Sequence, residues 1–300
     1  MSHLIANAKS RKTLDRLAAR LSSAEVNSDY FLEPFVFICG KFHSRRRDYL
    51  QKHIRKTHSN VHVFYAEDAW NHVRHLPLSA LQMESYLAKI ADMVIIIVES
   101  VGTAAELGAF ALNDDLRGKI FAVVDEEYKD DESFINTGPL RWLTTDSRFK
   151  PAFVQFEPMF EVVAELDQRL ELLKPPFRMR SRQTVTRTPR AREKHLMYLL
   201  CHIASMIGPA DASDFSYVIS KILADVDDWQ LNSLLGLATS LELTTCRGTG
   251  GEAKYSRNRA SGRALGTKIG VNANRERARV LDAVIATNSD TWRERIAELK

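Results

Sequence analysis

A buried strand that runs straight into a helix, in residues 94–110, constrains the fold of this chain most strongly. The apolar run at 94–98 predicts a strand covered on both faces, as in a parallel sheet between two layers of helices. Gly102 and Thr103 then predict a turn that opens a helix and presents backbone N–H groups to an anion. We expect Glu106 in the first turn of that helix. Acidic residues favour helix N-termini through the macrodipole, so spacing alone leaves a catalytic carboxylate and an ordinary glutamate equally open.

Alternating strands and helices in residues 31–174 predict the fold class, an α/β domain with a doubly wound parallel sheet. The expected strands are residues 35–39, 61–65, 93–98, 120–124 and 153–156. The expected helices are residues 45–57, 79–90, the Glu106 helix and 159–173, with a polar insertion at 125–150. Ligands of such sheets bind beyond the carboxyl ends of the strands, where the loops 40–43, 66–70 and 99–103 should meet.

Charge divides the chain at a basic segment, residues 175–191. Residues 1–174 carry a net charge of −3 and residues 175–300 a net charge of +7. The segment between them is rich in Pro, Ser and Thr without helical periodicity, which predicts an exposed linker. Residues 1–30 predict an amphipathic helix that packs on its own domain. This helix has no continuous apolar stretch, so we do not expect a secretory signal, and contact with a membrane or a partner is the alternative to packing.

Residues 192–300 predict a second, mostly helical domain. Helices are expected at 192–207, 212–223 and 228–241, followed by a hairpin within 244–255, the order found in a winged helix, and then by helices at 273–286 and 290–299. Residues 244–280 contain nine Lys or Arg and two acidic residues, which indicates either a phosphate-binding surface or a solvated basic loop. The candidate nucleic-acid-binding residues are Lys254, Tyr255, Arg257, Arg259, Arg263 and Lys268.

The three cysteines, Cys39, Cys201 and Cys246, lie far apart in the sequence. An odd number of separated thiols is typical of a reducing compartment, so we predict a cytoplasmic protein without disulfides. Their spacing does not suit a metal, and we predict no metal site. The longest apolar runs are too short to span a bilayer, which argues against a membrane partner.

Two motifs resemble the nucleoside 2-deoxyribosyltransferase family. Residues 37–42, Phe-Ile-Cys-Gly-Lys-Phe, are similar to the Gly-x-Phe signature of its first strand, and residues 102–110, Gly-Thr-Ala-Ala-Glu-Leu-Gly-Ala-Phe, resemble its Gly-Thr-Ala-x-Glu-x-Gly motif. The resemblance implies that Glu106 is the catalytic nucleophile. It also implies a substrate pocket formed by Gly40, Lys41, Phe42, Asp68, Ser100, Gly102 and Thr103.

The sequence departs from the family pattern at two positions. The aspartate that usually precedes the Gly-Thr turn is replaced by Glu99 and Ser100, and the tyrosine often found on the first strand is Phe37. Those polar groups help to orient a nucleoside, so the departures argue against ordinary base exchange. Glycosidic chemistry at Glu106 is still expected.

The basic second domain extends the resemblance to effectors of bacterial retron defence systems. Such effectors join a deoxyribosyltransferase-like domain to a winged-helix DNA-binding domain. The resemblance implies an N-glycosidase that attacks NAD as its substrate, without a cofactor. It also implies control by a retron reverse transcriptase and its multicopy single-stranded DNA (msDNA), a branched RNA and single-stranded DNA, within a possible higher-order assembly. Two alternatives stay open: an enzyme acting on nucleosides or deoxynucleotides, and a non-catalytic DNA-binding regulator that senses a nucleotide.

Among NAD, nucleosides and deoxynucleotides, the chemistry of the glycosidic bond favours NAD as the substrate. Breaking a ribosyl C1′–N bond passes through an oxocarbenium-like state, which one carboxylate can stabilise or trap as an ester. Nicotinamide leaves its cationic ring as a neutral molecule, whereas a neutral purine usually needs a proton, and the sequence shows no evident acid partner for Glu106. At the end of the second expected strand, Glu67 or Asp68 could bind ribose hydroxyls or cap a helix. A basic run, His43, Arg45, Arg46 and Arg47, could hold a pyrophosphate or form a solvated helix face.

Overall fold

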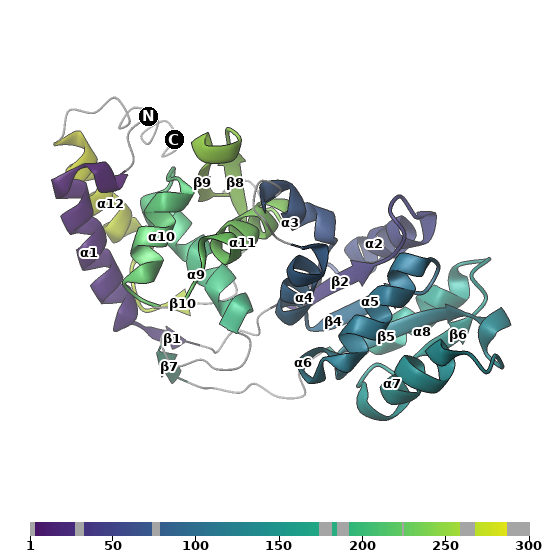
Figure 1. Cartoon of the computed structure of the whole chain (residues 1–300). Coiled ribbons are helices and arrows are strands. Elements are labelled where there is room, and N and C mark those ends of the chain that lie inside the picture. Colours follow the sequence, from purple (N-terminus) through teal and green to yellow (C-terminus); the bar gives the residue numbers. More distant parts are fainter. Residues whose placement is uncertain are drawn as a thin grey trace. The chain divides into compact units, whose positions relative to one another are not determined.

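A computed structural model of the chain describes residues 4–27, 33–73, 79–173, 182–184, 192–223, 225–258 and 268–286 (Figure 1). The chain forms two compact units, and each is built from separate segments of the sequence. The first unit comprises residues 1–32, 69–76 and 178–300, and the second comprises residues 33–68 and 77–177. In the part of the chain that the structure describes, no helix is both long enough and apolar enough to cross a membrane.

The second unit is built on a five-stranded sheet in which every neighbouring pair is parallel. The strand order is β3-β2-β4-β5-β6, which places the first strand of this unit inside the sheet. The strands are β2 (Phe35–Cys39), β3 (His62–Phe64), β4 (Met93–Ile97), β5 (Ile120–Asp125) and β6 (Ala152–Val154). The expectation of an α/β unit with a parallel sheet is confirmed.

The helices of this unit lie in two layers because the connections between parallel strands must cross over the sheet. Leu50 and Ile54 from α2 (Arg45–Thr57) share one apolar core with Leu166 and Leu170 from α8 (Phe160–Glu171). The helices α4 (Ala80–Ile90) and α5 (Val101–Leu112) contact β2, β4 and β5. Phe37 is buried in the core and stacks on Phe64 with ring centroids 5.2 Å apart.

Three parts of this unit differ from the sequence prediction. Residues 66–70 were expected as a loop, but a helix, α3 (Ala66–Val73), begins there. The polar insertion at 125–150 contains short helices: η2 (Glu126–Tyr128), η3 (Asn136–Leu140) and α7 (Arg141–Asp146). A further short helix, α6 (Asp114–Arg117), follows α5. Short helices of this kind carry too few residues to show a hydrophobic period.

The first unit contains three helices followed by a two-stranded antiparallel hairpin. The helices are α9 (Arg192–Ile207), α10 (Ala212–Ser220) and α11 (Asp228–Ser240), and the strands are β8 (Thr244–Arg247) and β9 (Lys254–Arg257). A final helix, α12 (Ala273–Ile285), contacts α9. Order and bounds agree closely with the helices and hairpin predicted from the sequence. The helix expected at 290–299 lies outside the described residues.

Residues from the two halves of the chain meet in this first unit. The short helix η1 (Leu4–Ala6) precedes α1 (Ala8–Ser22), which contacts α10 and α12. Arg20 donates to the buried Glu276 of α12 at 2.6 Å, and Tyr217 of α10 donates to Asp15 at 2.7 Å. The helix predicted at the start of the chain is therefore packed against helices that follow residue 191.

A small antiparallel sheet, β10-β1-β7, accompanies these helices. The strand β1 (Glu25–Asn27) precedes the α/β unit in sequence and β7 (Arg182–Thr184) follows it, and the two pair with each other. On its other side β1 pairs with β10 (Lys268–Ile269). Part of the segment predicted as a linker is thus a strand. This strand has only three residues and no alternation of apolar and polar side chains, so the sequence did not predict it.

Candidate active site

Glu106 lies in the second turn of α5, not in the first turn as predicted. The helix begins one residue after Ser100, whose hydroxyl accepts from the backbone N–H of Thr103, while the Thr103 hydroxyl accepts from the backbone N–H of Ser100. This reciprocal capping box starts the helix earlier than the Gly-Thr pair suggests. No acidic residue occupies the first turn of α5. The macrodipole acts mainly within that turn, so it does not explain the glutamate.

Two other carboxylates and a thiol surround Glu106. Glu84 from α4 and Cys39 from the end of β2 both lie within hydrogen-bonding reach of its carboxyl group, and Glu67 at the start of α3 lies close enough to act on it electrostatically. Oε2 of Glu106 is buried and accepts no hydrogen bond from a fixed donor among the described residues. A proton shared with Glu84 would supply the missing donor. Glu84 was not among the predicted site residues because it lies on another helix, α4, away in sequence from the motif at residues 102–110.

Burial and like charge both favour the protonated form of this pair. Burial first, and then the neighbouring charge of Glu84, raise the pKa of Glu106 from 4.5 to about 8. Burial also raises the pKa of Glu84. Two carboxyl groups in contact titrate as a unit, so near neutral pH the pair holds one proton. This arrangement places a second carboxyl group beside Glu106, a neighbour that the sequence did not reveal.

Cys39 stays a neutral thiol beside this pair. It is fully buried, and both burial and the charge of Glu106 raise its pKa well above the usual value. A thiolate is the nucleophilic form of cysteine, so Cys39 is not suited to attack a substrate. It can donate its S–H to Glu106, which acts to lower the pKa of that carboxyl.

Two of the four basic residues in the run after β2, Arg46 and Arg47, are paired with carboxylates, whereas His43 and Arg45 are exposed. Arg46 donates to Glu99 at 2.9 Å and to Glu157 at 3.3 Å. Arg47 is buried and donates to Glu67 at 2.9 Å. Neither guanidinium group is available as an uncompensated positive charge, which weakens the pyrophosphate hypothesis. The burial of Arg47 also contradicts the alternative of a solvated basic face.

Some of the predicted substrate-binding residues form hydrogen bonds with the backbone, and others are exposed to solvent. Ser100 and Thr103 cap α5, and the buried Thr103 hydroxyl also accepts from the backbone N–H of Glu99. The Asp68 carboxylate accepts from the backbone N–H of Tyr65 at 2.8 Å, as expected for a helix cap. Lys41, Phe42 and Gly102 are exposed.

Gly40 lies close to both ion pairs, Arg46–Glu99 and Arg47–Glu67. A Cβ atom at this position would approach the Arg47 side chain at 3.3 Å and Glu99 Oε1 at 3.4 Å. The backbone N–H of Lys41 donates to the same Glu99 oxygen at 3.1 Å. The absence of a side chain at residue 40 thus lets the loop after β2 approach Glu99. This is a packing role beside the site.

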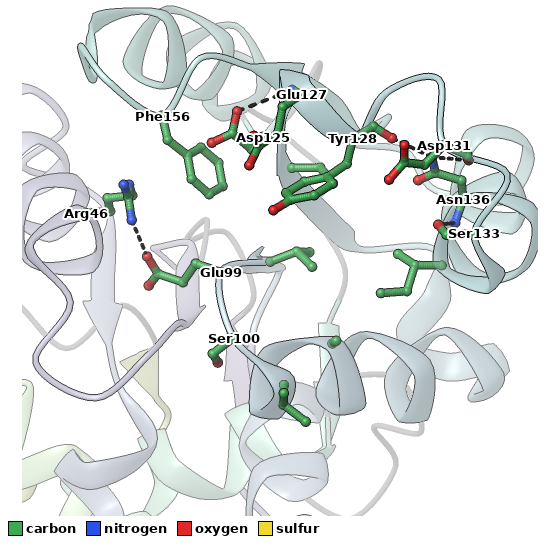
Figure 2. A pocket seen from close by; sticks show the side chains of 15 residues that line it. Arg46, Glu99, Ser100, Asp125, Glu127, Tyr128, Asp131, Ser133, Asn136 and Phe156 are labelled. Carbon is green, nitrogen blue, oxygen red and sulfur yellow. Dashed lines mark hydrogen bonds and ion pairs between the residues drawn. The ribbon is translucent and has the colours of Figure 1, made fainter.

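A cavity of about 490 Å³ opens at the carboxyl ends of β4 and β5 (Figure 2). Ser100 and Val101 of α5 line one side, and residues of the 125–136 segment line the other. Figure 2 shows the rings of Tyr128 and Phe156 facing this space, with the Arg46 and Glu99 pair at its edge. Four carboxylates line the cavity: Glu99, Asp125, Glu127 and Asp131. Glu106 is not among the lining residues.

The candidate nucleic-acid-binding residues of the first unit have different surroundings. Arg257 is exposed and Lys254 is partly exposed on the β8–β9 hairpin. Tyr255 is buried, and its ring packs edge-on against Phe215 with centroids 6.3 Å apart, so the ring belongs to the core and not to a binding surface. Lys268 pairs through its backbone in β10. Arg259 and Arg263 lie outside the described residues.

The chain thus joins a parallel α/β unit, in which Glu84 and Glu106 lie together, to a mostly helical unit with a basic hairpin. The family model described as STM3845 retron effector protein matches residues 43–246. This match covers more than half of the chain, and the chain belongs to that family of retron effectors.

Two curated relatives from Escherichia coli agree with this assignment. The chain is 26% identical to the protein named "Retron Ec73 putative ribosyltransferase/DNA-binding protein" over 238 residues, which cover 72% of this chain and 75% of the relative. It is 37% identical over 116 residues to the protein of the same description from retron Ec86, and this alignment covers 36% of each chain. Both names join a glycosyl-transfer activity to DNA binding.

Proposed function

We propose that this retron effector breaks the N-glycosidic bond between nicotinamide and ribose in NAD, with Glu106 as the carboxylate that stabilises or traps the ribosyl group. The observation that carries the proposal is the half-buried Glu106 held against Glu84 near the carboxyl end of β2. A carboxylate in such surroundings acts on a developing oxocarbenium charge far more strongly than it would in water.

The proposed step needs few groups. As the C1′–N bond breaks, its electron pair stays with the leaving base, and Glu106 faces the positive charge that develops at C1′. Water or another acceptor then takes the ribosyl group. Nicotinamide leaves as a neutral molecule because its ring starts as a cation, so this substrate needs no proton from the protein.

The charge of the site supports a cationic base. Glu67, Glu84 and Glu106 lie together, and only Glu67 is paired with an arginine among the described contacts. With Glu67 offset by Arg47 and one proton on the Glu84–Glu106 pair, the cluster keeps one negative charge, which attracts a positively charged ring. The nicotinamide ring of NAD carries such a charge, whereas the common nucleobases are neutral.

A second candidate is release of a purine from a nucleoside or deoxynucleotide, and Glu84 favours it. A neutral purine leaves readily only when it is protonated, and the carboxyl pair holds one proton near neutral pH. In this reaction Glu84 would pass that proton to the base while Glu106 faces C1′. The two candidates therefore differ in whether they need Glu84.

The purified protein and its Glu84→Gln and Glu106→Gln variants distinguish these candidates. Each is incubated with NAD or with a panel of nucleosides and deoxynucleotides, and free nicotinamide and free bases are measured. Nicotinamide release that requires Glu106 and largely survives Glu84→Gln supports NAD cleavage. Base release that requires both glutamates supports the second candidate. Failure to release either product would leave a nucleotide-sensing regulator as the better description.

We further propose that the first unit binds the retron reverse transcriptase and its msDNA, and that this cytoplasmic complex controls the enzyme. Helices α9, α10 and α11 followed by the β8–β9 hairpin have the order of a winged helix. Exposed Arg247 and Arg257 on the hairpin fit contacts with phosphate. The names of both relatives include DNA binding.

A further inference from the structure

Two histidines and an aspartate converge at the end of α2, away from the carboxylate pair. Nε2 of His53 lies 2.8 Å from Oδ1 of Asp167, and Nε2 of His58 lies 3.0 Å from the same oxygen. His53 is on the last turns of α2, His58 directly follows that helix, and Asp167 is on α8. All three potential ligand atoms lie within 4.8 Å of one another.

We propose that His53, His58 and Asp167 form a binding site for a divalent transition-metal ion of the Zn²⁺ class. Two imidazole nitrogens and one carboxylate oxygen are among the protein ligand sets that such ions take, with water in the fourth position. Ligands bound at about 2.0–2.2 Å in a tetrahedral site lie a little over 3 Å apart. The two histidine–aspartate separations of 2.8 and 3.0 Å are close to that value, and the two imidazole nitrogens lie within 4.8 Å of each other.

The accessibility of the two histidines also suits a metal. The His53 and His58 side chains are 18% and 16% exposed, so an ion can reach them while most of each ring is held by packing.

Such an ion would join the end of α2 to α8. Both helices pack on the same face of the sheet, and the first turn of α2 carries Arg46 and Arg47, which pair with Glu99 and Glu67. The metal would thus fasten one end of the helix whose other end supports the candidate active site. The cysteine spacing gave no sign of this site, and Asp167 lies more than a hundred residues beyond the two histidines in the sequence.

Calorimetry with Zn²⁺ and visible spectroscopy with Co²⁺ test the site in the full-length protein. The wild-type protein should bind one equivalent of Zn²⁺, and Co²⁺ should give the intense visible bands of a four-coordinate ion. Replacing His53 and His58 together by Ala, or Asp167 by Asn, should weaken Zn²⁺ binding on the order of 100-fold or more, since even a group that only supports a ligand is worth about 10–100-fold. Zn²⁺ should also raise the Tm of the wild-type protein alone.

Two controls keep this test decisive. His43→Ala removes an exposed histidine outside the cluster and should leave the affinity unchanged. Asp167→Asn keeps the shape of the side chain, and circular dichroism shows whether each variant is folded. The proposal is overturned if wild-type protein binds no Zn²⁺, if the variants bind it as tightly, or if Co²⁺ stays six-coordinate. In those cases the three residues form a hydrogen-bonded cluster only.

Discussion

Arg46 reaches across from the first turn of α2 to the buried carboxylate of Glu99, with Nη1 and Oε2 2.9 Å apart. Glu99 lies in the loop that follows β4, the central strand of the sheet. Its carboxylate also accepts from the backbone N–H of Lys41. The pair therefore ties the loop after β2 to the loop after β4. Both loops belong to the edge of the sheet where ligands of this fold class bind.

Breaking this pair should destabilise the protein. Arg46→Met leaves Glu99 buried with its charge uncompensated, and we expect a loss of about 2 kcal/mol or more in the free energy of unfolding, less than for a fully buried pair because Arg46 is 29% exposed. The double variant Arg46→Met and Glu99→Gln should recover part of that loss. Urea unfolding measures both. Glu165→Gln, in the more exposed pair with Arg169, serves as the control and should cost less than about 1 kcal/mol.

Glu106→Gln should abolish turnover and preserve the fold. The amide keeps the volume of the side chain but loses the charge that faces the oxocarbenium state, and the loss of such a group commonly costs on the order of 10²-fold or more in rate. Release of nicotinamide and of nucleobases should be followed over time, with Glu165→Gln as an active control. Wild-type turnover by Glu106→Gln on every tested glycoside would show that another residue performs the chemistry.

The same substitution should change how stability depends on pH. Because the folded protein raises the pKa of Glu106 from 4.5 to about 8, the folded state holds a proton that the unfolded state releases within this window. Wild-type stability should thus fall as pH rises from about 5 to 8, and level off above. Glu106→Gln lacks this proton, so its Tm advantage over wild type should be larger at pH 8.5 than at pH 5. An equal difference at both pH values would argue against the shared proton.

Arg257 of β9 and the two arginines that follow it in the sequence should govern nucleic-acid binding. Replacing Arg257, Arg259 and Arg263 by Ala should weaken association with msDNA and reduce the slope of log K against log salt by about one for each lost phosphate contact. Lys9→Ala, Lys12→Ala and Arg16→Ala, all on the exposed side of α1, remove the same charge elsewhere in the unit. If both triple variants behave alike, binding depends on overall charge and the hairpin is not the contact.

Release of the effector in cells should deplete NAD. An enzyme that cleaves an abundant cofactor must be restrained, so we expect growth arrest with falling NAD when wild-type protein is produced without its retron partners, and normal growth with Glu106→Gln. Metabolite measurement after induction checks this expectation. Arrest with unchanged NAD would contradict the substrate assignment and favour the nucleoside alternative.

Local sequence patterns predicted much of this molecule, whereas the site depended on contacts they do not record. The bounds of α2 and α9 follow from apolar periodicity, and β4 follows from an unbroken apolar run. Glu106 was found through its motif, but its partner Glu84 lies on another helix and carries no local signal. Similarly, the basic run at residues 45–47 suggested positive charges available to a ligand or to solvent. Local sequence does not show that Arg46 pairs with Glu99 and Arg47 with Glu67.

The pairing of β1 with β7 has a consequence for the order in which the chain is made. The α/β unit is inserted between these strands, so its sequence is complete while more than a hundred residues of the first unit are still to be synthesised. During that interval Leu14, Leu17 and Leu21 of α1 lack the helices that later cover them. A nascent or truncated chain therefore contains the complete α/β unit, with the proposed active site, before the unit proposed to bind the retron partners has been synthesised.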